Sequence, residues 1–135
     1  MNTKINSEIN DFIADRNIIK RKILSKAFNI ICEKFTLNTG ENLVFKYYEK
    51  KNKHFNSIES EANSLQYLLN KFPSLFPKIK YFSNNILVIE FIDHNNVKNN
   101  DYQKILAVEL FKLHKTTNDK YGFEFNTQIG GLKHT

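Results

Sequence analysis

The chain has 135 residues, 41% of them hydrophobic and 13% aromatic, which is enough for one hydrophobic core and unlike a disordered composition. Its formal net charge is +6, but the lysines are spread from Lys4 to Lys133, which argues against a dedicated nucleic-acid-binding surface. With the single cysteine Cys32 there is no intramolecular disulfide, and no segment approaches the ~18 apolar residues of a membrane span. We therefore expect a cytoplasmic protein without membrane association.

A short helix, three strands and a long helix are predicted in the first part of the chain. Apolar residues at helical spacing predict the first helix, namely Ile5, Ile9, Phe12 and Ile13. β-branched and aromatic residues predict strands at 18–24, 29–37 and 43–48, the last two joined as a hairpin by a turn at 38–40. The second helix is predicted from Phe55 to Phe72, where Pro73 ends it.

A second hairpin and a third helix are predicted next. The hairpin strands are 77–82 and 86–91, and the later one is apolar on both faces, as expected of a central strand. The polar, Asn-rich segment 93–100 is a linker by composition, and a helix follows it as far as His114. The tail 116–135 has no clear period and is expected to be mostly loop. This order predicts an α+β fold with an antiparallel sheet of about five strands.

Lys46 and Glu61 are candidates for a phosphate-binding pair, because the element order is that of a protein-kinase-like N-lobe. Lys46 falls on the third predicted strand and Glu61 on the helix that follows. In kinases a strand lysine holds the α- and β-phosphates of ATP and a helix carboxylate orients it. Period-two alternation places Lys46 on one face with Val44 and Tyr48, which could floor an adenine pocket. The alternative is that Lys46 and Glu61 are ordinary solvated surface residues.

Two further segments carry a resemblance to a known family. The apolar strand at 86–93, ILVIEFID, runs into the polar linker in the manner of a kinase hinge. The segment LFKLHKTTNDKYGFEFNTQIGGL resembles the fructosamine kinase (ketosamine kinase) pattern LxxLHxxTxxxYGFxxxNxIG. The matching residues are Leu110, Leu113, His114, Thr117, Tyr121, Gly122, Phe123, Ile129 and Gly130.

The resemblance implies a kinase-like N-lobe at 1–92, followed at 93–135 by a hinge or linker and the start of a truncated C-lobe. It implies membership of the wider group that includes aminoglycoside and choline phosphotransferases, with ATP as cofactor. The implied reaction is phosphoryl transfer to a sugar hydroxyl of a ketosamine. The residues expected at the nucleotide are Lys46 and Glu61, the tip residues Ser25, Lys26 and Asn29, and the hinge residues Glu90, Phe91 and Ile92.

The chain departs from the family pattern in two places. The tip at 25–29 has no glycine, whereas family members carry glycines there that let backbone amides approach the phosphates. In the tail, Thr127 stands where the family has asparagine, and Lys133-His134 stands where Pro-Gln is typical. These departures weaken the expected phosphate coverage and any inference about the acceptor substrate.

The family's His-Gly-Asp catalytic loop and its later Mg²⁺-binding aspartate do not occur in the 135 residues. We therefore assign no catalytic or metal-binding residue, and we expect the Mg²⁺ ligands on a missing C-lobe and no catalysis by this chain alone. The expected partner is a separately encoded C-lobe chain, or a second copy bound through the helix at 102–114. The alternatives are a pseudoenzyme that acts by nucleotide binding or protein contacts, and a basic nucleic-acid-binding domain.

Overall fold

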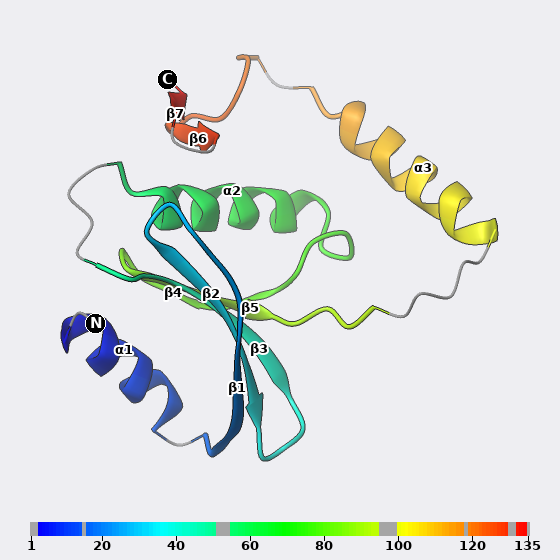
Figure 1. The fold of residues 1–135 in the computed structure, drawn as a ribbon. Coiled ribbons are helices and arrows are strands. Elements are labelled where there is room, and N and C mark those ends of the chain that lie inside the picture. The colour runs from blue at the N-terminus through cyan, green and yellow to red at the C-terminus, as the bar shows by residue number, and fades with distance from the viewer. Residues whose placement is uncertain are drawn as a thin grey trace.

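The computed structural model describes residues 3–14, 16–50, 55–94, 100–117, 119–129 and 132–134. The helices in these ranges are α1 (Thr3–Ile13), α2 (Ser57–Lys71) and α3 (Asn100–His114). The strands are β1 (Ile18–Ala27), β2 (Ile30–Leu37), β3 (Asn42–Tyr48), β4 (Ile79–Phe82), β5 (Ile86–Glu90), β6 (Thr127–Ile129) and β7 (Leu132–His134). Figure 1 shows their arrangement, which is the α+β fold predicted from the sequence.

The first five strands form one antiparallel sheet in the order β1-β2-β3-β5-β4, so that β1 and β4 are its edges. The helices α1 and α2 lie on opposite faces of this sheet (Figure 1). Along β2, half-buried residues alternate with buried ones, because successive side chains of a strand point to opposite faces. The predicted five-stranded sheet is confirmed.

The hydrophobic core lies on both sides of β3 and β5. On the α1 side, the rings of Phe35 and Phe45 have centroids 4.1 Å apart, and Phe12 of α1 meets Phe45 edge-on. On the α2 side, the buried apolar residues of the helix recur at helical spacing, namely Ile58, Ala62 and Leu65. All of 86–89 is buried, so β5 is an interior strand covered on both faces, as its sequence predicts.

The turn between β1 and β2 is tighter than predicted. β1 continues to Ala27, which pairs with Ile30, so Phe28 and Asn29 alone turn the chain. Their φ angles are 49° and 65°, the positive values that a two-residue turn of type I′ requires. Asparagine enters this region readily, whereas a bulky phenylalanine rarely does. The predicted end of β1 at Leu24 is wrong, because its pairing with β2 continues beyond that residue.

The third helix is confirmed as α3, while the predicted linker residues 95–99 lie outside the described part of the chain. Most described residues of the tail lie outside strands, as predicted, but β6 and β7 pair as an antiparallel hairpin. Strands this short have no readable period, which is why the prediction misses them. Among the described residues, no helix is long and apolar enough to cross a membrane.

Candidate functional site

Lys46 and Glu61 meet between the sheet and α2. Lys46 lies inside β3, opposite Cys32 of β2 and Leu87 of β5. Its amine donates to Glu61 Oε1 of α2, forming an ion pair. The two side chains are 27% and 42% exposed, so the pair remains open to solvent. The two residues are thus paired with each other while both side chains stay partly exposed.

Ser25, Cys32 and Lys46 form a row across neighbouring strands. Ser25 of β1 is opposite Cys32 of β2, which in turn is opposite Lys46 of β3. Burial raises the pKa of the Cys32 thiol, while the charge of Lys46 and a hydrogen bond with Ser25 oppose that rise. The register therefore places Ser25 on the same sheet face as Lys46, two strands away, with Cys32 between them.

The start of α2 is fastened to β3 by hydrogen bonds. The Tyr48 hydroxyl donates to Asn56 Oδ1 at 2.9 Å. Asn56 is the N-cap residue of α2, and its Oδ1 also accepts from the Glu59 N–H at 3.2 Å. Tyr48 and Lys46 lie on the same face of β3. The network therefore holds the start of α2 over the strand that carries Lys46.

The other two tip residues, Lys26 and Asn29, are not brought to this pair. Lys26 is opposite Ile31 in the register of β1 and β2, on the other face of the sheet, and its amine pairs with Glu49 at 3.2 Å. The side-chain amide of Asn29 donates to the Lys50 carbonyl at 3.1 Å and accepts from the Lys50 N–H at 3.0 Å. Both residues tie the tip of the first hairpin to the end of β3.

The residues expected at the hinge lie at the end of β5. Glu90 is engaged with Lys78, because its carboxylate accepts from the Lys78 N–H at 2.9 Å and its own N–H donates to the Lys78 carbonyl at 3.0 Å. The Phe91 N–H donates to the Asn42 carbonyl of β3 at 3.1 Å. Ile92 is 59% exposed. The N–H groups of Glu90 and Phe91 thus continue the sheet, and Ile92 follows as the exposed residue of the three.

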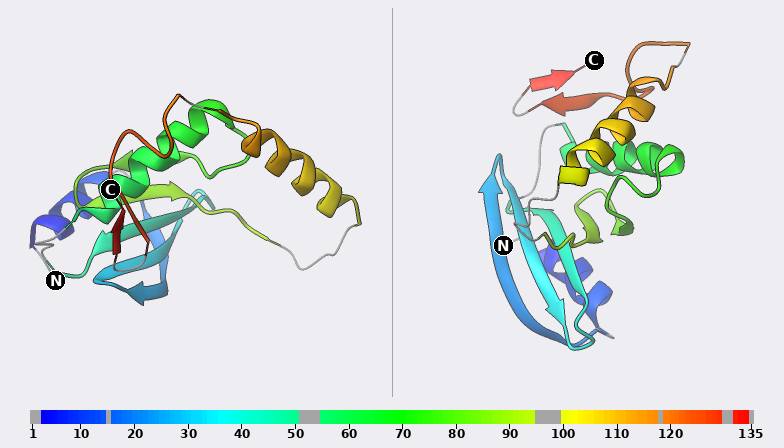
Figure 2. Two further views of the ribbon diagram at one scale, coloured as in Figure 1. Left: turned by 90° about the horizontal axis from the view of Figure 1, so that it is seen from above. Right: turned by 90° about the vertical axis from the view of Figure 1, so that its right-hand side faces the viewer.

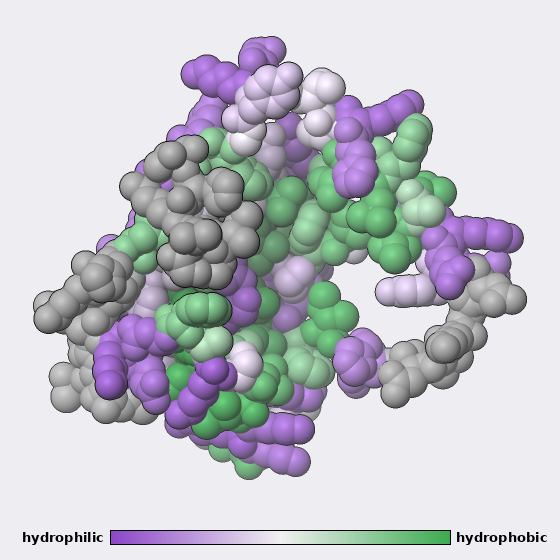
Figure 3. All heavy atoms as spheres, turned by 45° about the horizontal axis from the view of Figure 1, so that its top comes forward, coloured by the Kyte–Doolittle hydropathy of each residue, from purple (hydrophilic) through white to green (hydrophobic). Residues whose placement is uncertain are grey.

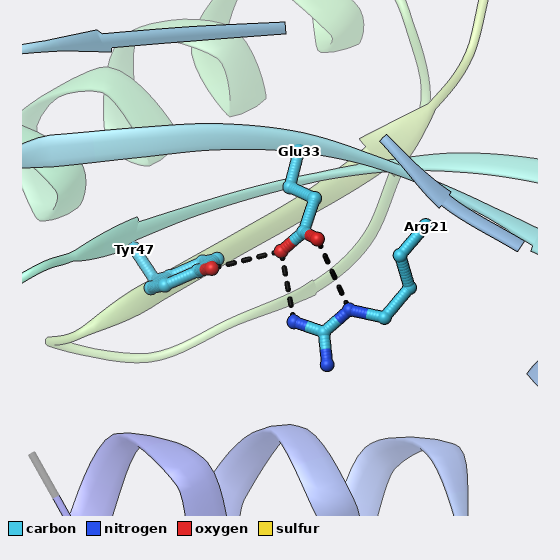
Figure 4. Close-up of polar contacts among 3 residues, drawn as sticks. All are labelled: Arg21, Glu33 and Tyr47. Atoms are coloured by element: carbon cyan, nitrogen blue, oxygen red, sulfur yellow. Dashed lines mark hydrogen bonds and ion pairs between the residues drawn. The ribbon is translucent and has the colours of Figure 1, made fainter. Parts of the chain in front are cut away.

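A second polar cluster lies on the sheet face that carries α1 (Figure 4). Buried Glu33 accepts hydrogen bonds from Arg21 Nε at 3.0 Å, from Arg21 NH2 at 2.9 Å and from the Tyr47 hydroxyl at 2.8 Å. Burial, assisted by the neighbouring Glu33, raises the pKa of Tyr47 to about 12. The hydrogen bond to Glu33 also raises the pKa of Arg21. Because both carboxylate oxygens have partners, this cluster stabilises the sheet.

The row beside Glu61 suits the binding of phosphate oxygens. The partly exposed ammonium of Lys46 can donate charge-assisted hydrogen bonds to an anion, and Glu61 holds that ammonium in place. Ser25 carries a hydroxyl donor on the same face of the sheet, two strands away. These residues fit the phosphate end of ATP. Among the described residues there is no group of three or more His, Cys, Asp or Glu that could hold a metal ion.

Asn56 and Ser60 support the site without being predicted for it, and Tyr48, which the sequence places on the face of Lys46, supports it through its hydroxyl. For two of them the sequence holds a signal. Tyr48 follows the strand lysine at the period of one face, and Asn56 stands three residues before Glu59, which is a capping pattern. Ser60 is buried, and its hydroxyl donates to the Asn126 carbonyl at 3.0 Å, 66 positions along the chain. No local pattern indicates so distant a contact.

Comparisons with known proteins show the family and the fold of the chain. The family model for fructosamine kinase matches residues 1–135. The fold is similar to that of a proposed fructosamine-3-kinase from Thermobifida fusca YX-ER1, with a TM-score of 0.78 and 16% identity over 98% of this chain and 46% of that chain. None of the curated proteins matches the chain in sequence.

Two further solved structures share the fold. One is APH(2″)-IIa in a ternary complex with streptomycin and ATP, with a TM-score of 0.59 and 18% identity over 88% of this chain and 42% of that chain. The other is the ethanolamine kinase of Plasmodium vivax, with a TM-score of 0.52 and 20% identity over 87% of this chain and 32% of that chain. The chain therefore spans less than half the length of each of these structures.

Proposed function

The chain belongs to the fructosamine kinase family, and from this premise we propose that it is the ATP-binding, N-terminal part of a phosphotransferase that acts on a sugar hydroxyl of a ketosamine. ATP, when bound, supplies the phosphoryl group that is transferred. The ATP complex solved for a neighbour of the same fold, APH(2″)-IIa, supports a nucleotide as the ligand. We further propose a boundary near residue 92, with the nucleotide-binding lobe before it and a hinge and the start of a second lobe after it.

The Lys46–Glu61 ion pair is the observation that carries this proposal. In a kinase-like lobe, a strand lysine held by a helix carboxylate binds the α- and β-phosphates. We assign that role to Lys46, with Glu61 orienting it and Ser25 contributing a hydroxyl. We assign Lys26 and Asn29 the role of closing the tip, since their contacts with Glu49 and Lys50 hold the hairpin against β3.

The adenine edge would be met by the backbone at the end of β5. The Phe91 N–H is already engaged by the Asn42 carbonyl. We therefore assign the donor for adenine to the backbone of Ile92, with Glu90 and Phe91 holding the segment against the sheet. The groups that activate the acceptor and bind Mg²⁺ belong, in this proposal, to the C-lobe of the phosphotransferase. We accordingly expect these 135 residues to bind ATP without transferring its phosphoryl group.

The test is ATP binding by the purified chain in the presence of Mg²⁺, measured by isothermal titration calorimetry for wild type and Lys46→Met. We expect the variant to lose about tenfold to a hundredfold in affinity, the range for hydrogen bonds that involve a charged group. Equal affinity of the two proteins would remove Lys46 from the site, and absence of binding to wild type would contradict the proposal.

Lys80→Met is the matched control. Lys80 also pairs with a glutamate, Glu41, at 3.1 Å, and its side chain is of comparable exposure. Because it lies on the edge strand β4, its loss removes one positive charge without touching Lys46. We expect wild-type ATP affinity from this variant. An equal loss in both variants, together with salt-dependent binding to generic DNA or RNA, would favour the basic nucleic-acid-binding alternative.

The helix α3 exposes a set of apolar side chains. Its exposed apolar residues are Tyr102, Ile105, Leu106, Val108, Leu110 and Phe111, and hydrophobic side chains are visible along it in Figure 3. A helix that is apolar around its circumference is normally buried. We propose that α3 packs against the helical C-lobe of the phosphotransferase. The expected result is that Ile105→Glu weakens association with that lobe, and concentration-dependent dimers in sedimentation experiments would favour self-association instead.

A further inference from the structure

The tail segment 123–127 lies against the face of α2 that points away from the sheet (Figures 1 and 2). Two contacts attach it. The Ser60 hydroxyl donates to the Asn126 carbonyl at 3.0 Å, and the Phe123 ring meets the Tyr67 ring edge-on with centroids 5.4 Å apart. Phe123 also stacks on Phe125 at 5.2 Å. Because residues seven apart share a helix face, Ser60 and Tyr67 form one stripe, and the tail follows it.

Ser60 is an unusual residue for its position. It is 7% exposed and lies inside α2, where serine is less favourable than alanine because its hydroxyl competes for backbone hydrogen bonds. The nearby Ser64 uses its hydroxyl within the helix, donating to the Ser60 carbonyl at 2.8 Å. The Ser60 hydroxyl instead reaches the tail. Its hydrogen bond therefore joins two parts of the chain, whereas that of Ser64 does not.

The side of α2 that carries Ser60 and Glu61 borders open space. A cavity of about 450 Å³ lies there, bounded by Ser60, Glu61 and Ser64 of the helix, by Phe28 of the first hairpin and by Thr127 of the tail. If α2 rotated about its own axis towards this cavity, Glu61 would move away from Lys46. The tail contacts lie where they resist such a rotation.

We propose that Ser60 is a positioning residue for Lys46: its hydrogen bond to Asn126 fixes the rotation of α2, and so keeps Glu61 paired with the lysine. Its relevance to ATP rests on the proposed function. In this arrangement, the tail that carries the family pattern organises the phosphate-binding lysine from the outer side of α2.

The first test does not involve nucleotide. The rate of reductive methylation of Lys46, followed by mass spectrometry, reports how firmly its amine is held, and Lys80 is the internal reference. We expect Ser60→Ala to raise the Lys46 rate about two- to tenfold, as loss of one hydrogen bond predicts, and to leave the Lys80 rate unchanged. The Glu61→Gln variant sets the upper limit of the Lys46 methylation rate. Ser60→Thr, which keeps a hydroxyl, and Ser64→Ala should both retain the wild-type rate.

A wild-type Lys46 rate in Ser60→Ala or in Glu61→Gln would overturn the proposal. So would a joint rise at Lys46 and Lys80, since that indicates general loosening of the fold. The second test is ATP affinity, which Ser60→Ala should lower in wild type but not in a Glu61→Gln background. Equal losses in both backgrounds would also overturn the positioning role. If wild type binds no ATP, the proposed function fails while the methylation rates still decide the role of Ser60.

Discussion

Arg21 of β1 and Glu33 of β2 form a bidentate ion pair. Arg21 Nε and Nη2 each donate to a separate carboxylate oxygen of Glu33 (Figure 4). The side chain of Glu33 is 7% exposed and that of Arg21 is 46% exposed. A carboxylate this deeply buried depends on its counter-ion, because an unpaired buried charge is costly. The sheet therefore has an ion pair with a buried carboxylate on the α1 face and the partly exposed ion pair of Lys46 with Glu61 on the α2 face.

Arg21→Met is expected to lower the free energy of unfolding by about 1–3 kcal/mol, because Glu33 loses two charged hydrogen bonds and keeps only that from Tyr47. Urea unfolding followed by circular dichroism measures the difference. Lys26→Met is the control, since the exposed pair of Lys26 with Glu49 on the same face should contribute at most about 1 kcal/mol. Equal losses in the two variants would contradict the special role of the buried carboxylate.

Tyr47 makes stability depend on alkaline pH. Its pKa is raised from 10 to about 12, chiefly by burial and secondly by Glu33. The folded state thus favours the neutral phenol, so this contribution to stability is complete below pH 10 and is lost as the pH rises through about 12. Wild type should therefore lose stability across this window more steeply than Tyr47→Phe. Other groups, including Cys32, are present in both proteins, so their effect on stability cancels in the comparison. Parallel curves of stability against pH for the two proteins would contradict the role assigned to Tyr47.

The local periods of strand and helix predict the order of elements, and the kinase-like order of those elements predicts the pairing of Lys46 with Glu61. The sequence does not predict which tip residues face that pair. The register of β1 shifts between Ile23 and Ser25, and such an irregularity reverses the faces of the residues that follow. Ser25 thereby reaches the face of Lys46, and Lys26 reaches the opposite one. A shift of this kind follows from the pairing of whole strands and has no signature in the residues around it.

The contact of Ser60 with Asn126 escapes sequence reasoning for a related reason. The tail strands are too short to show a period, and the hydrogen bond joins segments 66 positions apart. The family pattern indicates that the tail matters, but the pattern does not indicate what the tail touches. Its place on α2 follows from packing, in particular from the contact of Phe123 with Tyr67.

Asn29 has two separable effects on stability. Its φ of 65° is tolerated by asparagine and glycine, and its side chain exchanges two hydrogen bonds with the backbone of Lys50. Asn29→Gly removes the hydrogen bonds alone and should cost about 1 kcal/mol. Asn29→Ala also forces a side chain with no local hydrogen bond into the left-handed region, which adds about 1–2 kcal/mol. Calorimetry should show that thermal stability falls from wild type to Asn29→Gly to Asn29→Ala. A higher stability of Asn29→Ala than of Asn29→Gly would contradict the turn geometry.

Tyr48→Phe should loosen the start of α2 while leaving the core packed. The hydroxyl of Tyr48 donates to Asn56 Oδ1 at 2.9 Å and accepts from the Ile58 N–H at 3.3 Å, and the residue is 3% exposed. Its removal leaves these groups without that partner, at a cost of about 1–3 kcal/mol. Hydrogen exchange should accelerate at the Ile58 and Glu59 amides, with smaller changes in the last turn of α2.

Tyr102→Phe is the matched control for that variant, because the same hydroxyl is removed from a side chain that is 65% exposed on α3. It should leave both exchange and stability at wild-type values. Since Glu61 lies one turn beyond the cap, Tyr48→Phe should also weaken ATP binding, whereas Tyr102→Phe should not. Faster exchange at the start of α2 with unchanged ATP affinity would show that the cap stabilises the helix without positioning Glu61, and would leave Ser60 as the residue that sets its rotation.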